Sequence, residues 1–154
     1  MDSTVKKERY KINVAVYAII VRDGKILLSL RQGSGFFDGE YSFVSGHLES
    51  EETLAEAMIR EAREEANINI TKMRIGTVLF RFRPDKNYNN YLDCFFIIDE
   101  FEGEINNNEP TKCAELKFYP LENMPENTID YVKFSLKNAL SGIMYGEYKH
   151  YRPD

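Results

Sequence analysis

The chain contains few of the residues on which several common kinds of site depend. Its 154 residues include only two cysteines and two histidines. Cys94 and Cys113 lack the paired spacing of a zinc site and the context of a disulfide-rich protein, so we interpret both as buried thiols. No arrangement of serine, histidine and aspartate, or of cysteine and histidine, indicates a nucleophilic catalyst. Any chemistry in this chain must therefore depend on other side chains.

Long apolar runs are also lacking. The first eleven residues are polar and charged, and no segment has the apolar region of a signal peptide or the length needed to span a bilayer. The cysteine usage is typical of a reducing compartment. We therefore expect a soluble cytoplasmic protein with no membrane partner.

Positive charge is in deficit, because the formal net charge at pH 7 is −5. An acidic chain without a basic stripe repels nucleic acid, so we expect a small-molecule partner instead. With 43% hydrophobic residues, the chain can bury one sizeable core. We predict a single domain over residues 1–154, with its core at about residues 10–142, a short N-terminal extension and a C-terminal tail. The sequence leaves a homodimer open.

The apolar pattern predicts strands interleaved with two helices. The nearly continuous apolar run at residues 12–21 predicts a central strand covered on both faces, and Asp23-Gly24 predicts a two-residue turn into the next strand at residues 25–30. Further strands are predicted at residues 41–44, 72–83, 91–99 and 114–119. Strands with one helix after the third and another at the end predict an α/β fold, a mixed sheet with a helix on each side.

The predicted helices have recognisable ends. Ser50 is a suitable N-cap, so the first helix is expected to begin near residue 50. The second is expected to run from the N-cap Thr128 to near Gly142. The segment from Tyr145 onward has no assigned structure.

The first predicted helix contains three glutamates within a stretch of five residues, namely Glu61, Glu64 and Glu65. Positions three and four apart on a helix are neighbours, and each like-charged pair there destabilises it by about 0.2–0.5 kcal/mol. No basic residue lies three or four positions from Glu61 or Glu65, whereas Glu64 can pair with Arg60. Carboxylates at the rim of a core are typical ligands of a hard divalent cation. The cluster therefore predicts a cation site.

The residues around these glutamates follow a longer pattern that resembles the Nudix box, the signature of the MutT-type pyrophosphohydrolases. The pattern occupies residues 46–68 and departs from the family at one fixed position, where Asn67 replaces glycine. Asparagine also tolerates the left-handed conformation that ends a helix, so the departure is conservative. The matching positions are Gly46, Glu52, Arg60, Glu61, Ala62, Glu64, Glu65 and Ile68.

The Nudix resemblance implies an α/β/α sandwich with a mixed β-sheet between helices. It also implies hydrolysis, dependent on Mg²⁺ or Mn²⁺, of a phosphoanhydride bond in a nucleoside diphosphate linked to another group, such as a nucleoside triphosphate or ADP-ribose. One alternative is a non-catalytic nucleotide-sensing Nudix domain, which typically loses box glutamates. Another is the isomerase branch of the fold, which needs a catalytic cysteine that has no evident equivalent here.

The resemblance also implies roles for single residues. Glu61, Glu64 and Glu65 would bind the metal together with the backbone carbonyl of Ser45, and Arg60 would orient the carboxylates. Glu109 is the candidate catalytic base. Three other loop glutamates are its alternatives, namely Glu100, Glu102 and Glu104.

Substrate contacts are predicted outside the box. The resemblance places Arg31 on a phosphate and Asn127 on a purine base. Arg81 and Arg83 share a strand face from which they could reach phosphates. Three aromatic residues could stack a base, namely Phe36, Phe37 and Tyr91.

Three local interpretations complete the sequence analysis. Gly46 is expected in a tight loop that needs a positive φ or a close approach to phosphate. His47 is expected to support that loop rather than act as a base. Arg60 is expected to pair with Glu56 on the helix surface.

Overall fold

Nine strands and two α-helices lie within residues 6–151, the part of the chain that this computed structural model describes. The strands are β1 (Asn13–Ile19), β2 (Val21–Arg22), β3 (Lys25–Arg31), β4 (Tyr41–Ser42), β5 (Val44–His47), β6 (Asn69–Phe82), β7 (Tyr91–Glu102), β8 (Cys113–Pro120) and β9 (Tyr145–Lys149). The helices are α1 (Leu54–Ala66) and α2 (Asp130–Leu140), and a 3₁₀ turn covers Leu121–Asn123.

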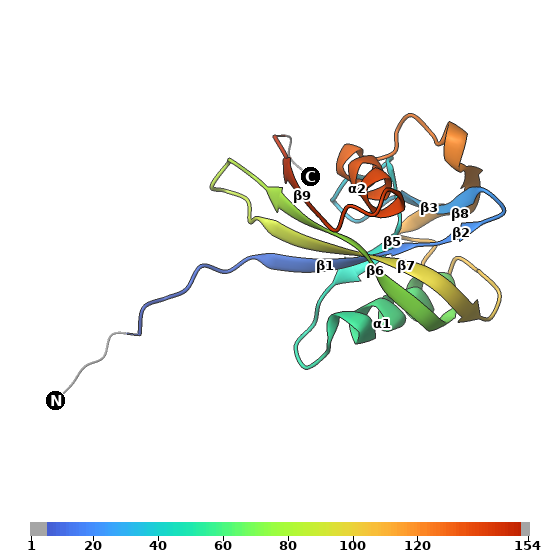
Figure 1. The fold of residues 1–154 in the computed structure, drawn as a ribbon, viewed down its shortest axis with the longest axis horizontal. Helices are drawn as coiled ribbons and strands as arrows, with labels where there is room; N and C mark the ends of the chain where they lie inside the picture. Colours follow the sequence, from blue (N-terminus) through green and yellow to red (C-terminus); the bar gives the residue numbers. More distant parts are fainter. Residues whose placement is uncertain (1–5, 152–154) are drawn as a thin grey trace.

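The strands form two sheets. The larger has the order β5-β1-β7-β6-β9 and is mixed, because β1 pairs in parallel with β7, and β6 with β9, while the other two pairings are antiparallel. The smaller sheet is antiparallel and is built around β3, which pairs with β2, β4 and β8. In Figure 1, β2, β3 and β8 lie at one end of the molecule, beside α2.

The two helices cover opposite faces of the larger sheet (Figure 1). Helix α1 contacts β5, β1 and β6, whereas α2 contacts β6, β9 and β7. Alternate side chains of β1 pack on the two faces of the sheet. Val16 belongs to the hydrophobic cluster that includes Met58 of α1, and Tyr17 belongs to the one that includes Val132 of α2. This double coverage explains the continuous apolar run. It confirms the predicted mixed sheet between helices.

The first predicted strand is divided. Residues 12–21 supply β1 and then β2, which belong to different sheets, so the run crosses from one sheet to the other near Ile20. The predicted turn is confirmed, because Asp23 and Gly24 have φ of 50° and 72° between β2 and β3. Two positive φ values are typical of the turn that matches strand twist in a hairpin.

Helix α1 begins later than predicted, because Thr53 rather than Ser50 is its N-cap. The Thr53 hydroxyl accepts a bond from the backbone N–H of Glu56, and the Glu56 carboxylate accepts one from the backbone N–H of Thr53. This reciprocal capping box satisfies two helix-end donors, which outweighs the single bond that Ser50 could accept. The helix ends as predicted at Asn67, whose φ is 60°.

Three other boundaries differ from the predictions. The strand at residues 41–44 divides into β4 and β5, and β5 continues through Gly46 to His47, so neither residue lies in a loop. Thr128 does not cap α2, since its hydroxyl donates to the carbonyl of Pro125 one turn earlier. The tail without assigned structure supplies β9, which pairs with β6.

A search of residues 6–151 for bilayer-spanning helices finds none that combines sufficient length with sufficient apolarity.

Candidate active site

Most of the predicted site residues line one cavity of about 550 Å³. Ser45 comes from β5, the three glutamates come from α1, and Glu109 comes from the connection between β7 and β8. Arg31, at the end of β3, and Arg60 line the same cavity. The fold thus brings residues from four separate segments to one place. The cavity is the candidate active site.

Glu65 is the most buried of the three glutamates. Its Oε2 accepts a bond of 3.1 Å from the backbone N–H of Ser45. Burial, and after it the neighbouring carboxylate of Glu61, raises the pKa of Glu65 to about 8, against smaller opposing effects of Ser45 and Arg31. The carboxylate is therefore held where its negative charge is poorly compensated.

Glu61 lies beside Glu65 and is also largely buried, with 12% of its side chain exposed. Burial raises its pKa, although Arg60 Nη1 donates a bond of 2.7 Å to its Oε1. The expectation that Glu61 has no local basic partner is therefore wrong, because the long side chain of Arg60 reaches its immediate neighbour. Gly46 faces the same carboxylate, and any Cβ at position 46 would overlap it. Glycine thus leaves room there for the Glu61 carboxylate, and it does not serve a turn.

Glu64 differs from the other two glutamates. Half of its side chain is exposed, and its Oε2 lies 3.3 Å from Nη1 of Arg60. Between residues 6 and 151, no three histidine, cysteine, aspartate or glutamate side chains are close enough together to hold a metal ion. The three glutamates share the cavity without forming a ready-made cluster.

Arg60 ties the start of α1 to the end of β5. Its Nε and Nη2 donate to the two oxygens of Glu52 over 3.0 and 2.7 Å, and Nη2 also donates to the carbonyl of His47 over 3.2 Å. The bonds from Arg60 lower the pKa of Glu52 to about 2. The predicted pairing with Glu56 is not formed, because Glu56 caps the helix. Arg60 is therefore bonded to carboxylates of the box, and its role in orienting them stays a prediction.

Glu109 reaches the candidate active site from outside the box. It lines the cavity, and its charge contributes to the raised pKa values of both Glu61 and Glu65. Its carbonyl accepts bonds from the backbone N–H groups of Lys112 and Cys113, which closes a turn and fixes its position. The three alternative glutamates are not among the residues that line the cavity. Of the four candidate bases, Glu109 is therefore the one that lies at the cavity.

The two predicted substrate-contacting residues have different positions. Arg31 lines the cavity, and its Nε donates to the carbonyl of Phe36 over 2.7 Å, so it also supports the loop at residues 32–40. Asn127 does not line the cavity; its side chain donates to the carbonyl of Gly39 on the same loop over 2.9 Å. Arg31 therefore lines the same cavity as the glutamates, whereas Asn127 lies outside this cavity.

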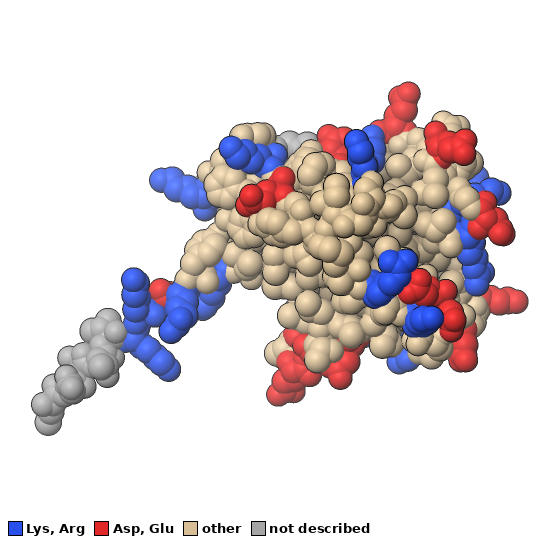
Figure 2. All heavy atoms as spheres, viewed as in Figure 1, with Lys and Arg blue, Asp and Glu red and all other residues tan. Residues whose placement is uncertain are grey.

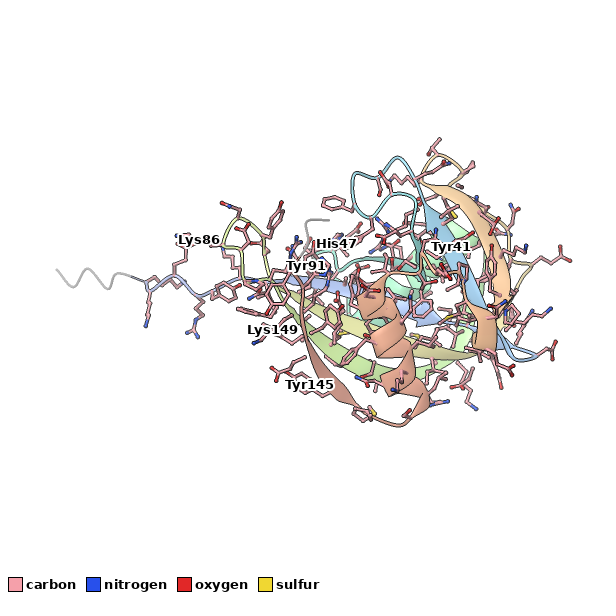
Figure 3. The ribbon with its side chains drawn as sticks, turned by 90° about the horizontal axis from the view of Figure 1, so that it is seen from above. Tyr41, His47, Lys86, Tyr91, Tyr145 and Lys149 are labelled. Carbon is pink, nitrogen blue, oxygen red and sulfur yellow. The ribbon has the colours of Figure 1, made fainter. Side chains whose placement is uncertain are left out.

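Aromatic side chains also line the cavity. Phe36 is 50% exposed and available for stacking, whereas Phe37 is buried and its ring packs 5.4 Å from that of His150. Tyr91 lies beside His47, with 3.3 Å between the tyrosine hydroxyl and Nε2 (Figure 3). His47 is thus part of the cavity wall, and the expectation that it only supports a loop is wrong.

A buried polar network beneath the cavity was not foreseen. Arg81 lines the cavity, and its guanidinium is also held by the protein: its Nε donates to Oδ2 of Asp93 over 2.8 Å, and the group lies 4.1 Å from the ring centroids of Tyr91 and Tyr131. The hydroxyl of Tyr17 donates to the other oxygen of Asp93. The available signal was Asp93 itself, the one acidic residue within an apolar strand segment. Arg83, whose guanidinium packs on Tyr88, does not line the cavity.

The two cysteines have different environments. Cys94 is buried as expected, and burial raises the pKa of its thiol to about 11. Cys113 is only half-buried and lines the cavity, where its sulfur accepts a bond from the hydroxyl of Ser29. The interpretation of Cys113 as a buried thiol is therefore wrong.

Comparison with known proteins shows the family of the chain. The model of the NUDIX domain family matches residues 9–137. An ADP-ribose pyrophosphatase from Methanocaldococcus jannaschii is 33% identical over 132 residues, which cover 84% of this chain and 75% of the relative. A CTP pyrophosphohydrolase from Escherichia coli is 43% identical over 61 residues, which cover 40% of this chain and 45% of that protein.

Solved structures agree as well. The crystal structure of a MutT NUDIX hydrolase from Burkholderia pseudomallei has a TM-score of 0.76 and 25% identity, and the match covers 84% of this chain and 98% of that one. The chain therefore belongs to the Nudix hydrolase family, whose members of known activity include the pyrophosphatases named above. The predicted assignment to the Nudix pyrophosphohydrolases is confirmed.

Proposed function

We propose that this enzyme uses Mg²⁺ or Mn²⁺ to hydrolyse a phosphoanhydride bond in a nucleoside diphosphate linked to another group, with a nucleoside triphosphate or an ADP-ribose-like nucleotide as substrate. The proposal is supported mainly by one observation. Two buried carboxylates, Glu61 and Glu65, lie together in the cavity, and both have raised pKa values. Such a pair is stabilised either by a proton or by a cation, and a divalent cation would compensate both carboxylates at once.

The donor set fits a hard divalent cation. Carboxylate and backbone carbonyl oxygens are the ligands that Mg²⁺ prefers, and no thiol or imidazole belongs to the proposed set. Glu61 and Glu65 would hold the ion with the carbonyl of Ser45, and Glu64 would join them by turning away from Arg60. When bound, the ion would neutralise phosphate oxygens and lower the pKa of the attacking water.

Other side chains would supply the remaining steps. The carboxylate of Glu109 would accept the proton of the attacking water, since it lines the cavity and comes from outside the metal-binding helix. Arg31 would offer its positive charge to a phosphate. Arg60 would keep the Glu61 carboxylate in place through its bond to Oε1. Asn127 would contact a purine only after the loop at residues 32–40 moved.

The choice of substrate has two sources of support. The relative from Methanocaldococcus jannaschii is an ADP-ribose pyrophosphatase. In addition, the cavity is lined by the glutamates of α1 and by aromatic residues that include Phe36 and Tyr91. The glutamates suit a metal-bound diphosphate, and an exposed ring suits stacking of a base. A cytoplasmic location remains a prediction from the sequence.

The test is a screen of nucleoside triphosphates, ADP-ribose and nucleotide sugars for release of phosphate, pyrophosphate or nucleoside monophosphate, with and without Mg²⁺. Glu65→Gln and Glu61→Gln keep the side-chain shape and remove the charge, so both are expected to lose most of the activity. Glu122→Gln is the matched control, because Glu122 is exposed and does not line the cavity. Full activity in both cavity variants would disprove the proposal.

The alternative of a non-catalytic nucleotide sensor makes a different prediction in the same screen. It requires nucleotide binding without turnover, which calorimetry would detect under the assay conditions. The box glutamates that such domains typically lose are all present here. Retention of these residues is why hydrolysis is the preferred proposal.

A further inference from the structure

The edge strand β9 has a free side. It is the last strand of the five-stranded sheet and pairs only with β6 among the described strands. Figure 3 shows Tyr145 and Lys149 at the outer margin of the molecule, with no ribbon beyond them. An edge strand presents unpaired backbone groups that can accept another strand.

The direction of the backbone groups in β9 follows from its bonds to β6. The N–H of Val78 donates to the carbonyl of Met144, and the N–H of His150 donates to the carbonyl of Phe82. In a parallel ladder, alternate residues turn their N–H and C=O to the same neighbour. Even-numbered residues of this segment therefore face β6, and Tyr145, Glu147, Lys149 and Tyr151 direct their backbone groups outward.

The outward-directed residues are self-complementary in an antiparallel arrangement. If two copies of the segment pair about an axis through Tyr148, Glu147 of each copy lies opposite Lys149 of the other. Tyr145 lies opposite Tyr151 in the same register. The alternative register centred on Glu147 would place two glutamates opposite each other, which is unfavourable. Charge thus selects one register.

Apolar side chains are concentrated beside this edge. Within residues 6–151, eleven large hydrophobic side chains are exposed, and six of them lie in α2, in β9 or in the segments next to β9. Figure 2 shows few charged side chains over the segment that joins α2 to β9. A partner at the β9 edge would cover those of the six that lie nearest the strand; the six are Phe134, Leu140, Ile143, Met144, Tyr145 and Tyr151.

The strand is also firmly built into the fold. A Cβ at Gly146 would lie 2.7 Å from Nδ2 of Asn138, so glycine allows β9 to pack closely against α2. The ring of Tyr148 lies 5.5 Å from that of Phe134 and 6.4 Å from that of Tyr131. The edge is therefore held in place before any partner arrives, which reduces the entropy lost on association.

We propose that β9 is a dimer interface, at which two copies of this chain join their five-stranded sheets through antiparallel pairing of residues 145–151. Glu147 and Lys149 form two reciprocal cross-strand ion pairs in this interface. The four tyrosines flank these pairs, and the surface around Phe134 and Ile143 becomes covered. This proposal does not depend on the substrate.

Charge reversal tests both the interface and its register. Sedimentation equilibrium of the full chain should give a dimer at tens of micromolar. Lys149→Glu, which turns both ion pairs into repulsions, should weaken dimerisation at least about tenfold. The double variant Glu147→Lys/Lys149→Glu restores complementarity with the signs exchanged and should restore the dimer. Lys25→Glu, in the exposed β2–β3 hairpin, is the matched control and should leave the dimer unchanged.

Two further measurements keep the test independent of folding defects. Glu147→Pro removes an outward N–H without removing a bond to β6, so it should give a folded monomer by circular dichroism. Carbodiimide treatment of mixed ¹⁴N and ¹⁵N protein should link Lys149 of one copy to Glu147 of the other, as detected by mass spectrometry. A wild-type monomer at several hundred micromolar, or a dimer insensitive to Lys149→Glu, would overturn the proposal.

Discussion

Gly46 and the carboxylate of Glu61 are in such close contact that no side chain fits between them. The first residue of the box thus lies against one of its glutamates, although fifteen positions separate them in the sequence. A side chain at position 46 therefore requires the Glu61 carboxylate to move.

This contact predicts the effect of Gly46→Ala. The added Cβ should displace the Glu61 carboxylate from Arg60 and from the position next to Glu65. Misplacement by about 1 Å commonly costs about 100-fold in activity, so we expect a loss of that order in kcat/KM. Thermal unfolding of the same variant provides the control. If kcat/KM were unchanged, the contact would have no role in placing the carboxylate.

The raised pKa of Glu65 predicts a pH-dependent stability in metal-free protein. Its pKa is about 8 in the folded state and close to the ordinary value of 4.5 when unfolded. The folded state then binds the proton more tightly, so this contribution to stability is complete below pH 4.5 and is lost as the pH rises to about 8. The change is on the order of a few kcal/mol.

Urea unfolding in the presence of a chelator between pH 5 and 8 measures this dependence. Glu65→Gln should flatten the decline, since it removes the titrating group. Mg²⁺ should do the same in the wild-type protein by compensating the ionised carboxylates. An equal decline in wild type and variant would assign the pH dependence to other groups.

Glu109→Gln tests the choice of catalytic base. General-base catalysis contributes about 100-fold or more, so kcat should fall by at least that factor while Mg²⁺ binding persists. Glu102→Gln provides the comparison, because Glu102 lies at the exposed end of β7 and outside the cavity. A larger effect of Glu102→Gln than of Glu109→Gln would reverse the assignment.

The ion pair of Arg81 and Asp93 predicts a large stability difference between two arginines of one strand. Arg81 is 3% exposed and Asp93 is fully buried, so Arg81→Leu leaves an uncompensated buried charge and should cost about 3–5 kcal/mol. Arg74→Leu, which breaks the exposed pair with Asp99 on the same two strands, should cost less than about 1 kcal/mol. Denaturant unfolding compares them directly. Similar losses would mean that the network beneath the cavity is not the main stabilising feature.

The sequence predicted the sheet and the box because both depend on local patterns. The apolar run of β1 requires burial on both faces, and the Asp23-Gly24 turn depends on two residues. The spacing of the three glutamates along one helix predicted that they would lie together, and all three line one cavity. These features need no knowledge of distant contacts.

The remaining features depend on contacts between distant segments. Strand β9 is five residues long and gains its place by pairing with β6, so its own sequence carried little signal. The exact partners of Arg60 were also missed, because a flexible side chain selected Glu52, eight positions away, over the helical neighbour Glu56. The start of α1 could have been found, since Thr53 and Glu56 have the spacing of a capping box.

The placement of the two histidines has a practical consequence for spectroscopy. They are the only imidazoles in the chain, and their environments differ: His47 lines the cavity, whereas His150 does not line it and packs against the ring of Phe37. Their ring proton resonances would be resolved without selective labelling. A nucleotide that entered the cavity would shift the signal of His47 directly, and any movement of Phe37 would change the ring current at His150.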